Sequence, residues 1–99
     1  MADYYFTNKA VDDLTQIWDY TFEEWSKRQA NKYYNELIAA CKKIARNSAL
    51  GRKYSKVSPD LLGFHVNRHI IFFRQINPDF VEITRILHES MDLKMRLLE

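Results

Sequence analysis

The sequence has one cysteine, two glycines and two prolines in 99 residues, so it has few helix breakers and cannot form an internal disulfide. Cys41 falls on an apolar helical stripe with Leu37 and Ile44, which predicts a small core residue rather than a reactive thiol. With 46% hydrophobic and 28% charged residues, the composition is typical of a folded domain and not of a disordered segment. We expect residues 1–99 to form a single domain that buries roughly 60–65% of its unfolded surface.

Membrane and targeting segments are also missing from the sequence. The apolar run Ile70–Phe73 is far shorter than the roughly 20 residues that span a bilayer. The first ten residues lack the basic start and apolar run of a secretory signal. We therefore expect a cytoplasmic protein with no membrane partner.

The common signatures of cofactor and catalytic sites are absent as well. There is no glycine-rich phosphate loop, no cysteine pair or His-x-x-x-His zinc spacing, and no serine nucleophile elbow. His65, His69 and His88 match no compact ligand motif, which favours structural or hydrogen-bonding roles over catalysis or metal binding. These absences predict no cofactor, no metal and no catalytic residues.

The net charge of +2 hides a strong asymmetry along the chain. Residues 1–25 carry six acidic residues against one lysine, whereas residues 26–56 carry nine basic residues against one glutamate. This basic block is either a solvated face or a surface that meets an acidic protein segment or phosphates.

Apolar spacing in the first half predicts two helices. Thr7 is placed to cap a helix over about 8–25, and Ser26 with Gln29 forms a capping-box pattern before a helix over about 27–47. The short connection predicts an antiparallel hairpin. Tyr4–Thr7 reads as a short strand before the first helix, and Asn47–Asp60 as a surface loop.

The last third alternates with the period of strands. Leu62–Val66, His69–Ile76 and Phe80 to about Leu87 are separated by turn residues, which predicts an antiparallel meander. The middle strand is apolar on both faces, with Ile70, Phe72 and Ile76 on one face. The hairpin covers only one face. A final helix capped by Ser90 aligns Met91, Met95 and Leu98, which could partly cover the other face or meet a partner. The predicted fold class is therefore α+β.

Several segments in this order resemble a known toxin family. They are Asp13-Leu14 with Ile17–Tyr20, Gly51 in the loop, His69–Arg74, and Glu82–Asp92. The last segment is the most specific, because it is similar to an "I-x-R-V-L-H" strand end followed by "x-S/R-M-D/N". The chain from Tyr4 to Leu97 resembles the ParE branch of the RelE/ParE toxin superfamily.

The resemblance implies a helical hairpin on a twisted antiparallel sheet, pairing with a ParD-like antitoxin, and inhibition of DNA gyrase by binding without catalysis. It also implies a toxin–antitoxin hetero-oligomer that meets operator DNA only through the antitoxin. The sister branch that resembles RelE cuts messenger RNA on the ribosome, and the sequence departs from its pattern. His88-Glu89-Ser90 replaces a basic triplet, and no tyrosine follows Tyr54. Ribonuclease activity stays the alternative, through His69, His88, Arg68 and Arg85.

Two sets of binding residues are predicted. The target-binding candidates lie where the resemblance is densest, at Arg85, His88, Ser90, Met91 and Asp92. The antitoxin-binding candidates are aromatic residues that exceed what a small core can enclose, together with nearby cations. These candidates are Trp18, Phe22, Trp25, Arg52, Lys53, Phe72 and Arg74.

Overall fold

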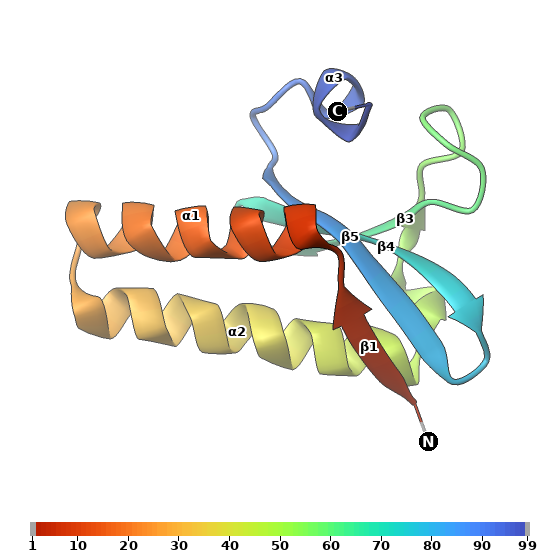
Figure 1. The fold of residues 1–99 in the computed structure, drawn as a ribbon, viewed down its shortest axis with the longest axis horizontal. Coiled ribbons are helices and arrows are strands. Elements are labelled where there is room, and N and C mark those ends of the chain that lie inside the picture. Colours follow the sequence, from red (N-terminus) through yellow and green to blue (C-terminus); the bar gives the residue numbers. More distant parts are fainter. Residues whose placement is uncertain (1, 99) are drawn as a thin grey trace.

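A computed structural model describes residues 2–98 (Figure 1). In chain order the elements are β1 (Asp3–Phe6), α1 (Asn8–Glu24), α2 (Lys27–Arg46), a 3₁₀ turn η1 (Ser48–Leu50), β2 (Arg52–Lys53), β3 (Leu62–Val66), β4 (His69–Asn77), β5 (Phe80–His88) and α3 (Leu93–Leu97). The predicted α+β class, hairpin and meander are confirmed. The predicted loop at residues 47–60 was wrong in part, because it contains η1 and the edge strand β2. No helix within residues 2–98 is both long and apolar enough to cross a membrane.

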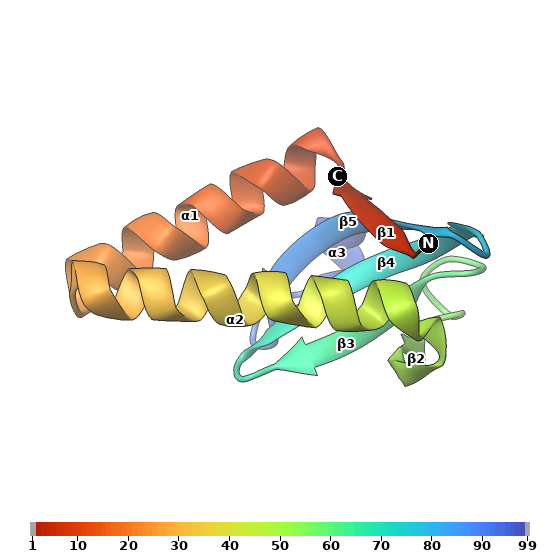
Figure 2. The same cartoon turned by 90° about the horizontal axis from the view of Figure 1, so that it is seen from below.

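The caps predicted for the two helices of the hairpin are present. The Thr7 hydroxyl accepts a hydrogen bond from the Ala10 N–H at 3.1 Å, and the Ser26 hydroxyl accepts one from the Gln29 N–H at 3.0 Å. Each bond satisfies an N–H that has no partner within its helix. The two helices fold back on one another and cover one face of the sheet (Figures 1 and 2).

The sheet has the order β1-β5-β4-β3-β2. The meander strands pair antiparallel, whereas β1 pairs parallel with β5, from Asp3 opposite Phe80 to Phe6 opposite Ile83. Turn chemistry sets the two hairpins: Asn67 has a positive φ of 53°, and the Asn77 side chain accepts a bond from the Asp79 N–H at 2.8 Å. The parallel pairing therefore brings together β1 and β5, the first and last strands along the sequence.

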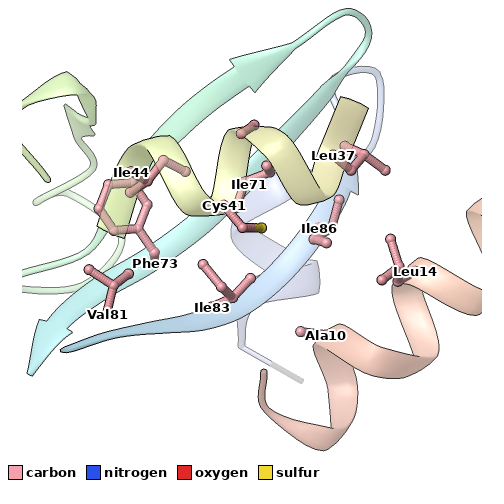
Figure 3. Close-up of a cluster of buried hydrophobic side chains, with 11 residues drawn as sticks. Ala10, Leu14, Leu37, Cys41, Ile44, Ile71, Phe73, Val81, Ile83 and Ile86 are labelled. Atoms are coloured by element: carbon pink, nitrogen blue, oxygen red, sulfur yellow. The ribbon is translucent and has the colours of Figure 1, made fainter. Parts of the chain in front are cut away.

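The main core lies between the hairpin and the sheet (Figure 3). Leu37, Cys41 and Ile44 of α2 pack against Ile71 and Phe73 of β4, and all five are fully buried. Burial raises the pKa of the Cys41 thiol to about 12, because an apolar environment disfavours the thiolate. The prediction that Cys41 is a core residue is confirmed.

The opposite face of the sheet carries a second, smaller core. Its buried members are Leu61, Ile70, Phe72 and Leu87, and it is covered by Tyr54, Val57, Leu93 and Leu97. Ile76, which the alternation along β4 places with Ile70 and Phe72, is not part of this core and is 52% exposed. It lies where β4 and β5 shift register between Gln75 and Asn77, and it has no paired residue on β5.

The C-terminal helix also differs from its prediction. Asp92, not Ser90, caps it, through a bond from the Met95 N–H to the Asp92 carboxylate at 3.3 Å. The helix starts two residues later than predicted, so a different set of side chains points toward the sheet. Leu93 and Leu97 contact the second core. Of the two alternatives for the aligned residues, covering this face was wrong, because all three are exposed: Met91 by 39%, Met95 by 63% and Leu98 by 68%.

Candidate binding surfaces

A cleft of about 1020 Å³ lies between the outer half of the hairpin and the end of the sheet. Its walls come from α1, α2, the turn between β3 and β4, and the end of β5. Four of the five predicted target-binding residues line it, namely Arg85, His88, Ser90 and Met91. The fifth, Asp92, is not among the lining residues and caps α3.

A chain of hydrogen bonds in this cleft determines which ring nitrogen of His69 carries the proton. The Tyr33 hydroxyl lies 3.0 Å from the Val66 carbonyl oxygen and 2.6 Å from His69 Nδ1. A carbonyl can only accept, so the single hydroxyl proton points to Val66 and His69 Nδ1 carries the proton that it donates to Tyr33. Burial and the nearby His88 lower the pKa of His69 to about 4, so its ring is neutral at pH 7.

His88 is held by Ser90, the residue that the sequence predicts as a helix cap. The Ser90 N–H donates to His88 Nδ1 at 3.1 Å, and the Ser90 hydroxyl lies 2.7 Å from the same nitrogen. Because Nδ1 accepts, a neutral His88 carries its proton on Nε2. The His69 and His88 rings meet edge to face, with centroids 5.2 Å apart.

The lowered pKa of His69 predicts a loss of stability in mild acid. The folded-state pKa of about 4 lies below the ordinary value of 6.5, so the unfolded chain binds the proton more readily. The stabilisation is therefore fully present above pH 6.5 and decreases as pH falls toward 4. Discounted for the partial exposure of the ring, the change is about 1–2 kcal/mol.

His69→Gln is expected to flatten this pH dependence, measured by urea unfolding at pH 7 and pH 4.5. His65→Gln is the matched control, because His65 is an exposed histidine on the neighbouring strand β3. Equal changes in wild type, the control and His69→Gln would show that His69 does not cause the effect.

Arg85 is not the exposed contact that the sequence suggested. Its side chain is 12% exposed and forms an ion pair with Asp13 of α1, with Nε 2.7 Å from Oδ2 and Nη2 3.0 Å from Oδ1. The same carboxylate accepts the Ile86 N–H at 3.0 Å. Sequence analysis missed this role for Asp13, although the Asp13-Leu14 pair belongs to the segments that carry the family resemblance.

A second, apolar groove follows the outer side of the hairpin. A hollow of about 350 Å³ is lined by Val11, Leu14, Trp18 and Tyr34 among others, and a neighbouring hollow of about 560 Å³ extends from Val11 to β1. Trp18 stacks on Phe22 with centroids 5.3 Å apart and donates from its indole N–H to Asn31 at 3.1 Å. Phe22 stays 46% exposed beside the groove.

The seven predicted antitoxin-binding residues do not form one surface. Trp18 and Phe22 lie together at the outer groove, whereas Trp25, which is 76% exposed, lines the cleft. Arg52 and Lys53 are exposed on the edge strand β2, and Arg74 donates to Ser58 at 2.8 Å. Phe72 is fully buried in the second core, so its placement on an accessible surface was wrong.

A helical hairpin on one face of a five-stranded sheet is the fold that the resemblance to the RelE/ParE toxins implies. Within residues 2–98, no group of three or more histidine, cysteine or acidic side chains is arranged to hold a metal ion. A family model described as "ParE toxin of type II toxin-antitoxin system, parDE" matches residues 4–93. The chain belongs to this family.

Curated relatives and a solved structure agree with this assignment. Toxin ParE1 of Caulobacter vibrioides is 31% identical over 97 residues, which cover 98% of this chain and 99% of the relative. Toxin ParE1 of Mycobacterium tuberculosis is 30% identical over 94 residues, covering 95% and 96%. A solved structure described as "Chromosomal ParDE TA system from P. aeruginosa" has a TM-score of 0.76 at 20% identity, covers 89% of this chain and 96% of its own, and shows the same fold.

Proposed function

We propose that this ParE-type toxin inhibits DNA gyrase by binding it, without catalysing a reaction. The observation that carries the proposal is that two of the four side chains named for the ribonuclease alternative form hydrogen bonds or ion pairs within the toxin itself. Arg85 is paired with Asp13, and His69 is neutral and bonded to Tyr33. A paired Arg85 is poorly placed to stabilise negative charge on a phosphate, and a neutral His69 offers neither a positive charge nor a spare ring proton for general-acid catalysis.

The protein surface supports a binding role. The cleft brings His88, Ser90 and Met91 together with the exposed Trp25, so fixed polar groups lie beside adaptable apolar ones. Aromatic residues and methionine are enriched where proteins recognise other proteins. The gyrase surface that meets the cleft is expected to bury Met91 and Trp25.

We further propose that a ParD-like antitoxin neutralises the toxin in a cytoplasmic hetero-oligomer, and that operator DNA is bound by the antitoxin. The related P. aeruginosa structure is described as a ParDE system, which supports such a partner. The outer groove offers an apolar path beside Lys42 and Arg46 of α2, which suits an acidic and apolar segment that orders on binding.

A pair of assays tests the proposed target. Purified toxin is expected to inhibit supercoiling by gyrase and to leave ribosome-bound message intact. Addition of the cognate antitoxin is expected to restore supercoiling, which controls for contaminants. Cleaved message with unaffected supercoiling would instead establish the ribonuclease alternative.

A further inference from the structure

The outer edge of β5 loses its neighbouring strand halfway along. β1 pairs only with the first part of β5 and ends at Phe6, opposite Ile83. Beyond that point side chains from the start of the hairpin replace the missing strand. The Thr7 hydroxyl donates to the Thr84 carbonyl at 2.8 Å, and the Asp13 carboxylate accepts the Ile86 N–H at 3.0 Å. Asp13 therefore continues the edge hydrogen bonding of the sheet from a helix.

A bulge in β5, in its pairing with β4, decides to which face of the sheet the Arg85 side chain points. Phe73 lies opposite Ile83 and Phe72 opposite Arg85, so Thr84 is an extra residue in β5. Directly paired residues point to the same face, which places the base of the Arg85 side chain with Phe72 on the face away from the hairpin. Because β1 has ended, the guanidinium can pass around the open edge to Asp13.

One guanidinium therefore connects elements on opposite faces of the sheet. Two of its nitrogens bond Asp13 on α1, and Nη1 donates to the Arg96 carbonyl in α3 at 2.8 Å. Figure 1 shows α1 and α3 as separate elements with the end of β5 leading to α3. The Asp13 and Arg85 side chains are only 10% and 12% exposed, so water competes little with these bonds.

The C-terminal segment depends on this contact for its orientation. Its helix has five residues, which is too short to be stable alone. Leu93 and Leu97 attach it to the second core, but apolar contacts are not directional. The bond from Arg85 to the Arg96 carbonyl is directional and fixes the helix while Met91 and Met95 face outward.

We propose that Asp13 and Arg85 are positioning residues, which hold residues 91–98 in the orientation that binds the target. The ordering of this segment follows from the geometry alone, whereas its effect on the target rests on the function proposed above. The prediction is that loss of the Asp13–Arg85 pair releases the segment and weakens inhibition, with the rest of the toxin intact.

Two variants break the pair with little disturbance elsewhere. Arg85→Lys keeps the positive charge but loses the forked geometry that reaches Asp13 and Arg96 together. The double variant Asp13→Asn with Arg85→Met leaves no unpaired buried charge and keeps an amide oxygen for the Ile86 N–H. Arg28→Lys is the matched control, since it makes the same exchange at an exposed position on α2 that lines neither the cleft nor the outer groove.

Mobility of the segment can be read directly with a nitroxide label on Met95→Cys, because position 95 is exposed and the buried, high-pKa Cys41 resists labelling. The label is expected to be restrained in the parent and in Arg28→Lys, and to become mobile in both pair-breaking variants. The two pair-breaking variants, made without the label and with Met95 intact, are expected to inhibit gyrase at least about tenfold more weakly than wild type. Their antitoxin affinity is expected to stay within about twofold of wild type.

A label that stays restrained in both pair-breaking variants would overturn the inference. Increased mobility with unchanged inhibition would also overturn it, as would loss of antitoxin affinity in step with inhibition. If wild-type toxin does not inhibit gyrase, the proposed function fails, but the label spectra still decide whether the pair orders the segment.

Discussion

Met91→Glu combined with Met95→Glu is expected to reduce gyrase inhibition by at least about 100-fold. Both side chains are exposed, by 39% and 63%, so neither contributes much to the core. Placing a carboxylate in an apolar interface leaves an unpaired charge without water, and two such changes together cost more than about 2.7 kcal/mol. The measurement is the toxin concentration that halves supercoiling.

The thermal midpoint and the antitoxin affinity of this double variant are expected to stay close to those of wild type. Ile76→Glu is the control for an added charge, since Ile76 is 52% exposed near the turn between β4 and β5. Wild-type inhibition by the Met91 and Met95 double variant would contradict the assignment of the C-terminal segment to target binding.

Deletion after Glu89 is a less selective test than these point variants. It removes Leu93 and Leu97, which cover the second core and are partly buried, so each contributes a part of the about 1.5–3 kcal/mol that a fully buried leucine is worth. A domain of this size loses roughly 4–8 °C of its midpoint for each kcal/mol. The segment is therefore a packing element through Leu93 and Leu97, and we propose that it binds the target through its opposite side.

Trp18→Ala combined with Phe22→Ala is expected to weaken antitoxin binding by about 100-fold or more. The two rings stack at the outer groove, where a partner would cover them, and large aromatic residues dominate binding energy at such positions. The loss is expected in a faster dissociation rate, because removed apolar contacts act after encounter. Surface plasmon resonance with immobilised antitoxin measures both rates.

Arg52→Glu with Lys53→Glu supplies the electrostatic comparison. Both residues are exposed on the edge strand β2, and their reversal is expected to slow association at low salt, with the difference shrinking as salt is added. Unchanged association rates at low salt would remove β2 from the antitoxin interface. Unchanged dissociation in the Trp18 and Phe22 double variant would remove the outer groove from it.

Elements of the fold could be predicted because their signals are local. A cap such as Ser26 bonds an N–H three residues away, and the turn at Asn77 bonds the N–H two residues away. The apolar period of α2 likewise places Leu37, Cys41 and Ile44 on one face whatever packs against it. Short-range geometry of this kind can be read from sequence alone.

The faces and partners of those elements could not be read in the same way. The sequence shows Met91, Met95 and Leu98 at helical spacing, but the cap at Asp92 turns Leu93 and Leu97 inward instead. Likewise the alternation along β4 places Ile76 with Phe72, but Phe72 is buried whereas Ile76 lies at a register shift and is exposed. A shift of one residue in a strand, or of two residues in the start of a helix, turns the side chains to the other face, and neither leaves a clear local signal in the sequence.

The sequence by itself determined the order and type of the main elements, although not η1 and β2, together with the family and the crowding of candidate residues near the end of the chain. Only the tertiary structure decided what those residues do. It buried Phe72, separated Trp25 from Trp18, and paired Arg85 with Asp13 across 72 positions of sequence. The pairing of Arg85 with Asp13 depends on where β1 ends and on the bulge in β5. It forms only when distant segments pack together, because their buried polar groups then need hydrogen-bond partners.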